Sequence, residues 1–197
     1  SVQDRLSHAV KVLSGAGAQV VTGGREGGGR GYCFSNTLLR TDAATFLRNP
    51  AAMQEEAFGN AALFVVARDL TEAAGVLEAL DGNLTGAIYS DTGGSDDGAY
   101  ASIASILRGK VGRLLNDKMP TGVAVSPAMN HGGPYPATGH PGFTAVGIPA
   151  SLRRFAALHC YDNVRDARLP PSLRNQNPNG RLWRSIDGAF TQADVSA

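Results

Sequence analysis

The sequence predicts an α/β fold in which a largely parallel sheet is covered by helices. From residue 61 onward, short apolar segments alternate with amphipathic segments whose apolar residues recur at helical spacing. Helices between successive strands imply right-handed crossovers, which leave neighbouring strands parallel and buried on both faces. The predicted order is strand 61–67, helix 70–80, strand 84–90, helix 97–108 and strand 111–115.

The predicted helices have recognisable ends. Residues 2–13 carry an apolar stripe at helical spacing, and serine and glycine follow it. Asp69 and Glu72 stand three residues apart, which is the spacing of a capping box at the start of the second helix. Gly109 is a natural end for the third helix. The predicted buried face of the second helix consists of Leu70, Ala73, Ala74 and Leu77.

A glycine-rich run at residues 23–31 lies between two predicted extended segments, 19–22 and 32–40. A phosphate-binding loop needs a helix directly after it, and an extended segment follows this run instead. We therefore predict a surface loop that joins two strands and has no catalytic role. A small α/β domain that binds an anion beside this run, through Arg25 and Arg30, is an alternative from composition alone.

Residues 116–150 predict a long irregular region rich in proline, glycine, histidine and asparagine. Long loops inside compact domains are uncommon and usually functional, so this region is the first place to look for a site. We predict a further strand at residues 154–161 and an extended arm from Leu169 onward. Trp183 in this arm is expected to anchor the tail on its own domain or on a neighbouring subunit.

Composition excludes several classes of protein. The chain has 197 residues and a net charge of +1, with basic and acidic residues spread along its length, so nucleic acid is not an expected partner. Its apolar stretches are shorter than the roughly 20 residues of a membrane span, and no secretion signal is visible. The two cysteines, Cys33 and Cys160, form no zinc-binding pattern. We expect a cytoplasmic protein with no metal site and no membrane association.

Few residues suggest chemistry by type alone. His159 and Cys160 are adjacent on a predicted strand and would point to opposite faces, which argues against a nucleophile and base pair. Two neighbouring carboxylates usually mark a solvated helix end. The histidines His8 and His140 are predicted to lie at the surface. The candidates are Glu55, Glu56, His131, His140, His159 and Cys160.

An ordered series of motifs resembles the aldehyde dehydrogenase superfamily. The string EEAFGN at 55–60 follows GYCFSNTLL, precedes AALFVVARDLTEA, and resembles the EEIFGP region of that family. Asn60 stands where the family commonly has proline. The resemblance covers nearly the whole chain and identifies it as the C-terminal part of such an enzyme. Later segments are similar to the branch that oxidises α-ketoglutarate semialdehyde (2,5-dioxovalerate): GRLLND at 112–117, PTGVAVSPAMNHGGPYPAT at 120–138, FTAVG at 143–147, RRF at 153–155 and QNPNGRLWRSIDG at 176–188.

The resemblance implies roles for four residues. Glu56 would accept hydrogen bonds from the nicotinamide ribose of NAD or NADP, and Phe58 would pack near the nicotinamide. Asn130 and His131 would face a small aldehyde substrate, and His131 could donate to the distal carboxylate of a semialdehyde. A second interpretation of His131, in which it only hydrogen-bonds a loop carbonyl, is left open.

The resemblance also implies that no catalytic residue lies in this chain. In the family, the nucleophilic cysteine, the activating glutamate and the dinucleotide-binding fold precede the EEIFGP-like motif by more sequence than is present here. Cys33 is too close to Glu56 to be that nucleophile. We therefore expect this chain alone to be inactive, and its missing partner to be the N-terminal part of the same enzyme. The sequence does not decide between NAD and NADP.

Two functional classes remain open for the chain. One is part of a dehydrogenase, with residues 1–150 as the C-terminal part of the catalytic domain and 151–197 as an oligomerisation strand and C-terminal arm. The other is a noncatalytic assembly module that keeps the sheet and the oligomer-forming strand. In the family, the strand that matches 154–161 extends a sheet across subunits, so we expect a homo-oligomer.

Overall fold

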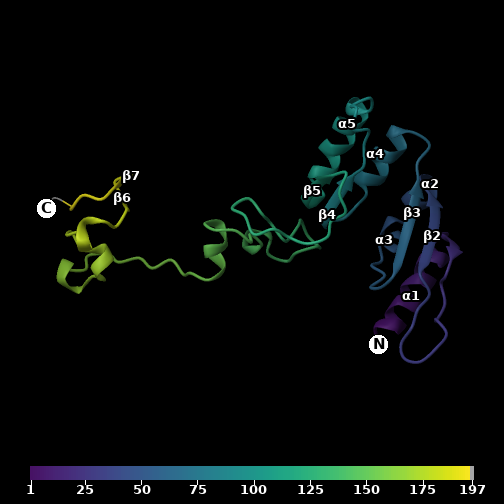
Figure 1. Ribbon diagram of the computed structural model, residues 1–197, viewed down its shortest axis with the longest axis horizontal. Helices are drawn as coiled ribbons and strands as arrows, with labels where there is room; N and C mark the ends of the chain where they lie inside the picture. The colour runs from purple at the N-terminus through teal and green to yellow at the C-terminus, as the bar shows by residue number, and fades with distance from the viewer. Residues whose placement is uncertain (196–197) are drawn as a thin grey trace. The chain divides into compact units, whose positions relative to one another are not determined.

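A computed structural model describes residues 1–195 of the chain (Figure 1). The chain divides into two compact units, residues 1–154 and residues from Phe155 onward. The functional assignment of 1–150 and 151–197 stays a prediction.

The first helix, α1 (Val2–Gly15), confirms the helix predicted at residues 2–13. Its start carries a capping box, in which the Ser1 hydroxyl accepts from the Asp4 amide and the Asp4 carboxylate accepts from the backbone nitrogen of Ser1. The apolar stripe of α1 is buried through Leu6, Ala9, Val10 and Leu13.

A three-stranded sheet follows, with the order β1-β2-β3. Strand β1 (Gln19–Thr22) pairs antiparallel with β2 (Thr37–Asp42), and β2 pairs parallel with β3 (Ala61–Val66). The glycine-rich run joins β1 and β2, as predicted. The extended segment predicted at 32–40 becomes regular strand only from Thr37, after an isolated bridge between Glu26 and Phe34.

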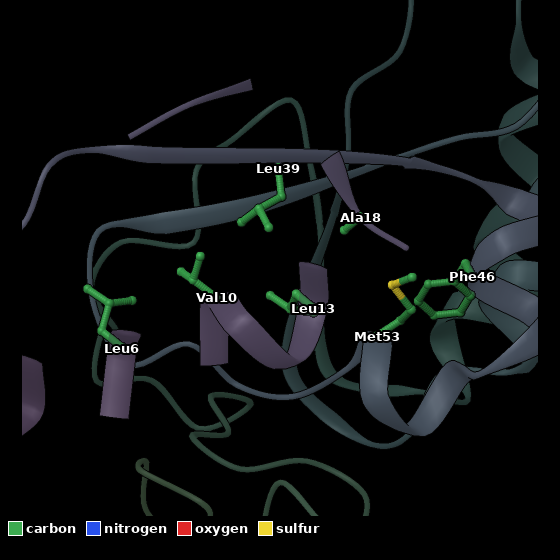
Figure 2. Packing of buried hydrophobic residues seen from close by; sticks show 7 residues of the cluster. All are labelled: Leu6, Val10, Leu13, Ala18, Leu39, Phe46 and Met53. Atoms are coloured by element: carbon green, nitrogen blue, oxygen red, sulfur yellow. The ribbon is translucent and has the colours of Figure 1, made fainter. Parts of the chain in front are cut away.

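Two short helices that the sequence analysis did not predict, α2 (Ala43–Arg48) and α3 (Pro50–Met53), close the core of this unit. Leu39 of β2 is completely buried at its centre. Figure 2 shows the side chains that form this cluster. They are Leu6, Val10, Leu13, Ala18, Leu39, Phe46 and Met53.

The second half of the first unit alternates as predicted: α4 (Leu70–Glu78), β4 (Asn83–Ile88), α5 (Asp97–Arg108) and β5 (Val111–Asn116). Strands β4 and β5 are parallel, and α4 and α5 contact each other (Figure 1). Gly109 is the C-cap of α5, as predicted.

The prediction of one largely parallel sheet needs correction. The fold is mixed α/β, but β2-β3 and β4-β5 belong to separate small sheets, and β1 is antiparallel. Strand β3 is also not covered on both faces, because alternate residues are exposed and Phe64 retains 58% of its accessible surface. Local periodicity identifies strands, whereas pairing depends on contacts between residues distant in sequence.

The start of α4 differs from the predicted capping box. Asp69 caps the helix by accepting from the Glu72 amide at 2.9 Å, but the Glu72 carboxylate accepts from the Arg68 amide at 2.8 Å instead of the cap residue. Hydrogen bonds from the Arg68 side chain lower the pKa of Glu72. None of the four residues predicted to form the buried face of α4 is fully buried: Leu70 is 50% exposed, and Ala73, Ala74 and Leu77 are half-buried.

Residues 117–149 are largely irregular, as predicted, with a bridge between Asn130 and Ala145 and a 3-10 turn at Pro141–Phe143. The strand predicted at 154–161 is wrong. Another 3-10 turn, Ala150–Arg154, ends where that strand would begin, and residues 156–161 have no regular structure. Leu158 in this segment is 99% exposed.

The second unit contains a hairpin, where only an extended arm was predicted from the sequence. Strands β6 (Arg184–Ile186) and β7 (Ala189–Thr191) pair antiparallel. The turn residues Asp187 and Gly188 both have positive φ, at 49° and 82°. Such a two-residue Asp-Gly turn matches the twist of paired strands.

Polar contacts hold the second unit together more than apolar packing does. Asn177 is buried, and its side-chain amide donates to the carbonyls of Leu182 and Gln192 at 2.8 and 2.6 Å. Trp183 is 64% exposed, so it does not anchor the tail within this unit.

Candidate functional site

The loop at residues 55–60 is fixed at its far end by two tight contacts. Gly59 lies against α1, because a Cβ at this position would be only 2.6 Å from a methyl carbon of Leu6. The Asn60 side chain donates to the carbonyl of Phe34 at 2.9 Å and to the side chain of Asn36 at 2.8 Å. Asparagine therefore ties the loop to the segment before β2, and proline could not make these two bonds.

Glu56 and Phe58, predicted to contact the cofactor, line one cavity of about 540 Å³. Phe58 is 60% exposed, so its ring is available to a ligand. The opposite wall comes from α1, whose residues Asp4, Arg5 and His8 lie on one face of the helix. The structure thus brings the two predicted residues together with Glu55, a candidate by residue type, and adds three residues of α1 that the sequence did not single out.

The wall formed by α1 carries charge of both signs. Asp4 supplies the acidic group, and its carboxylate accepts from the Ser1 hydroxyl at 2.8 Å. Arg5 and His8 supply the basic groups. His8 is exposed, as predicted, but it faces the same cavity as Glu56.

Glu56 also lines a second cavity of about 450 Å³, which extends toward the irregular region at Pro136 and Ala137. Gln54 stabilises its floor by donating to the carbonyl of Ala79 at 3.1 Å and accepting from the Asp81 amide at 2.7 Å. Glu56 therefore stands where the loop, the end of α4 and the irregular region meet.

Asn130 and His131, predicted to face the substrate, lie together on the irregular region but line neither cavity. The Asn130 side chain accepts from the Thr144 hydroxyl and donates to the Gly132 carbonyl at 3.3 Å. The His131 amide donates to the Thr144 carbonyl at 2.9 Å, while its imidazole is exposed. Asn130 shapes the loop, and His131 is the residue whose side chain remains available.

The other sequence candidates form no catalytic arrangement. Cys33 is half-buried in the glycine-rich loop, and its thiol lies 3.7 Å from the Arg30 carbonyl. His159 and Cys160 are both exposed, outside any strand. Among residues 1–195, no group of three or more histidine, cysteine or acidic side chains could hold a metal ion. The helices of this described part are also too short or too polar to cross a membrane.

The conformation of the acidic loop between β4 and α5 is held by hydrogen bonds among its own residues. Hydrogen bonds from Ser95 and from the Gly93 amide lower the pKa of Asp91. The Asp96 carboxylate in turn accepts from the Asp91 amide at 3.0 Å. These carboxylates shape the turn before α5.

Comparison with known proteins gives the family. No protein-family model matches the chain. It is 45% identical over 142 residues to alpha-ketoglutaric semialdehyde dehydrogenase 2 of Azospirillum brasilense, covering 72% of this chain and 26% of that protein. It is 36% identical over 155 residues to alpha-ketoglutaric semialdehyde dehydrogenase of Acinetobacter baylyi, covering 79% of this chain and 29% of that protein.

Solved structures show the same fold. Betaine aldehyde dehydrogenase of Staphylococcus aureus in complex with NAD+ has a TM-score of 0.52 at 22% identity, over 67% of this chain and 25% of that chain. 1-Pyrroline-5-carboxylate dehydrogenase from Thermus with bound NAD has a TM-score of 0.50 at 24% identity, over 67% of this chain and 23% of that chain.

With these matches, the fold and the loop at 55–60 define the chain as part of the aldehyde dehydrogenase superfamily. Within that superfamily it resembles the alpha-ketoglutaric semialdehyde dehydrogenases. The chain spans about a quarter of the length of the curated relatives that it matches.

Proposed function

We propose that this chain forms part of an NAD(P)-dependent aldehyde dehydrogenase that oxidises α-ketoglutaric semialdehyde to the carboxylic acid. The observation that carries the proposal is the match to two alpha-ketoglutaric semialdehyde dehydrogenases over 72% and 79% of the chain. Most of the length of those relatives has no counterpart here, so the activity belongs to a larger protein.

In this proposal, Glu56 and Phe58 form one wall of the nicotinamide site. The Glu56 carboxylate accepts hydrogen bonds from the ribose hydroxyls, and the exposed ring of Phe58 limits where the nicotinamide settles. Their position on one cavity supports these roles. The bound NAD or NADP supplies the acceptor for the hydride of the aldehyde.

In the same proposal, the irregular region at residues 117–149 forms the part of the site that binds the substrate. His131 donates from its exposed imidazole to the carboxylate of the semialdehyde, while Asn130 holds the loop through Thr144. The nucleophilic cysteine lies outside this chain. Cys33, half-buried in the loop between β1 and β2, does not line the cavity of Glu56.

The cofactor role is tested by titrating the chain with NADH and following saturation-transfer difference NMR signals. We expect weak binding in which the nicotinamide and adjacent ribose protons receive the strongest transfer. Replacing Glu56 by glutamine removes a charged acceptor, and we expect it to weaken binding about tenfold. The native chain is expected to reduce neither NAD+ nor NADP+ in the presence of the semialdehyde.

Glu78→Gln makes the same chemical change at an exposed position of α4 that lines neither cavity, and it should leave NADH binding unchanged. Equal effects of the two substitutions would contradict the role of Glu56. NADH formation above a control without protein would contradict the assignment of the nucleophile to another part of the enzyme.

We also propose that the chain takes part in a homo-oligomer through residues 155–161. Phe155 and Leu158 are 83% and 99% exposed in this segment, and solvent-exposed apolar groups of this density favour an interface. This observation equally supports the alternative of a noncatalytic assembly module, which would keep the interface and lack cofactor binding.

Light scattering during size-exclusion chromatography measures this association. We expect the native chain to have a mass above that of a monomer, and Leu158→Asp to return it to the monomer because a charge cannot be buried in the interface. Leu173→Asp changes another exposed leucine, outside the segment, and should keep the native mass. Loss of association in both variants would indicate nonspecific apolar contact instead.

A further inference from the structure

Strand β3 leaves one of its edges unpaired. In the part of the chain that is described, β3 pairs only with β2. The Thr37 amide donates to the Asn60 carbonyl at 2.9 Å, while Thr37 lies in register with Ala61. In a parallel ladder with this pattern, every second residue of β3 directs its N–H and C=O groups away from β2. The residues whose backbone groups point to the free edge are therefore Ala61, Leu63 and Val65.

One face of the same strand is also uncovered. The side chains of the three residues that point their backbone groups to the free edge pack against the buried cluster around Leu39. The alternate side chains lie on the opposite face, where Phe64 is 58% exposed and Val66 is 42% exposed. Strands in parallel sheets are usually buried on both faces, because crossover helices cover them. The open face of β3 thus lacks the layer that a parallel sheet normally has.

The two sheets with parallel strands are joined by a helical crossover. Helix α4 connects β3 with β4, and it contacts both α2 and α5. Strand β4 also ends its sheet, because it pairs only with β5 among residues 1–195. A crossover through a helix joins parallel strands of one sheet, and in doubly wound sheets some crossovers pass over intervening strands. Strands β3 and β4 therefore have the connection expected of two strands of one sheet whose intervening strands are supplied by another part of the enzyme.

The composition of β3 favours pairing with a further strand. Exposed edges are usually protected by charged residues or proline, and β3 has the sequence AALFVV, which contains neither. Unpaired backbone groups beside apolar side chains are a template for another extended segment. The chain matches only 26% and 29% of the length of the two alpha-ketoglutaric semialdehyde dehydrogenases, so most of an enzyme of this kind is available to cover the strand.

We propose that the remaining part of the dehydrogenase docks on the β3 surface, defined as the free edge of β3 together with Phe64 and Val66. The docking segment is apolar and pairs with β3 as a parallel strand, so that backbone hydrogen bonds fix its register. The inference rests on the proposed function, which makes this chain one part of a larger enzyme. A second copy of this chain is the competing occupant, and the experiment separates the two.

The first measurement is copurification. This chain carries an affinity tag and is produced in the same cells as the part of the Azospirillum brasilense dehydrogenase that it does not match. We expect the two polypeptides to purify together. Phe64→Asp is expected to lower recovery of the partner about tenfold or more, because a carboxylate is then buried against an apolar segment without a counter-charge. Since Phe64 is more than half exposed, the variant chain alone should keep its native circular dichroism spectrum and thermal midpoint.

Phe190→Asp is the matched control. It makes the same change at a phenylalanine of β7 that is 78% exposed and lies in the second unit. Recovery of the partner should stay within about twofold of the native value. The proposal fails if the native chain forms no complex, or if Phe64→Asp recovers as much partner as Phe190→Asp does.

Hydrogen exchange tests the pairing itself. It is followed by mass spectrometry with fragmentation to single residues, in the chain alone and in the complex. In the chain alone, the amides of Leu63 and Val65 should exchange rapidly, and the amide of Phe64, which points toward β2, should exchange slowly. In the complex, exchange at Leu63 and Val65 is expected to slow about tenfold or more. Unchanged exchange at these two amides would contradict a paired strand. Protection that appears in the chain alone and rises with its concentration would identify a second copy as the occupant and overturn the proposal.

The outcome is separable from that of the proposed function. If the complex forms through Phe64 but reduces neither NAD+ nor NADP+ with the semialdehyde, the dehydrogenase proposal fails and the docking surface stands. If NADH binds the chain through Glu56 while no complex forms, the docking inference fails and the dehydrogenase proposal stands.

Discussion

Replacement of Leu39 by alanine is expected to destabilise the first unit by about 2–5 kcal/mol. Leu39 is 0% exposed and lies on β2 within a cluster of only seven buried side chains (Figure 2). Strand β2 is the central strand of its sheet, so a cavity here removes contacts on the face that packs against α1. Urea unfolding followed by far-ultraviolet circular dichroism measures the change as a lower midpoint.

Val21→Ala is the control on the neighbouring strand β1. Its side chain is 57% exposed, so truncation should change stability by no more than about 0.5 kcal/mol. If both substitutions had similar effects, the cluster around Leu39 would not be the core of this unit.

The elements of the first unit were predictable because their patterns are local. The helix predicted at 97–108 has the same bounds as α5, and the strand predicted at 61–67 differs from β3 by one residue. Apolar residues repeat there at the period of a helix or a strand, and Gly109 marks the end of α5. Neither signal depends on the rest of the molecule.

The sheet pairing could not be predicted from these signals. Strand β1 runs antiparallel to β2, and β4-β5 forms a sheet separate from β3, because pairing follows from contacts between distant residues. The strand expected at 154–161 fails for a related reason. An extended apolar segment becomes a strand only when another strand pairs with it, and none of the strands described within residues 1–195 pairs with this segment.

The hairpin of β6 and β7 could have been found from the sequence. Asp187 and Gly188 form an Asp-Gly dipeptide between two short segments, which is a strong hairpin signal. The density of proline and asparagine before it favoured an extended arm instead.

For the candidate site, the sequence motif identified Glu56 and Phe58, and the structure shows that both line one cavity. The motif gave no information about the residues on the opposite wall. Asp4 and His8 stand four residues apart on α1, so a shared face was predictable. Which loop that face meets was not, because it depends on how α1 packs against Gly59.

Gly112→Ala is expected to separate β5 from the loop that carries Asn130 and His131. A Cβ at residue 112 would overlap the Gly132 carbonyl, and Gly133 similarly has no space because its Cβ would overlap the Asn83 carbonyl. Both obstacles are backbone atoms, so no side-chain rotation relieves the overlap, and strand and loop must move apart. We expect a loss of about 1–3 kcal/mol, the range for overpacked sites, measured by thermal unfolding. The amide signals of Asn130 and His131 should shift in the same variant.

Gly142→Ala provides the control, because it lies in the same irregular region and a Cβ there meets nothing within 4 Å. Its stability should stay within about 0.5 kcal/mol of the native chain. Native stability and unshifted Asn130 and His131 signals in Gly112→Ala would mean that β5 does not support this loop.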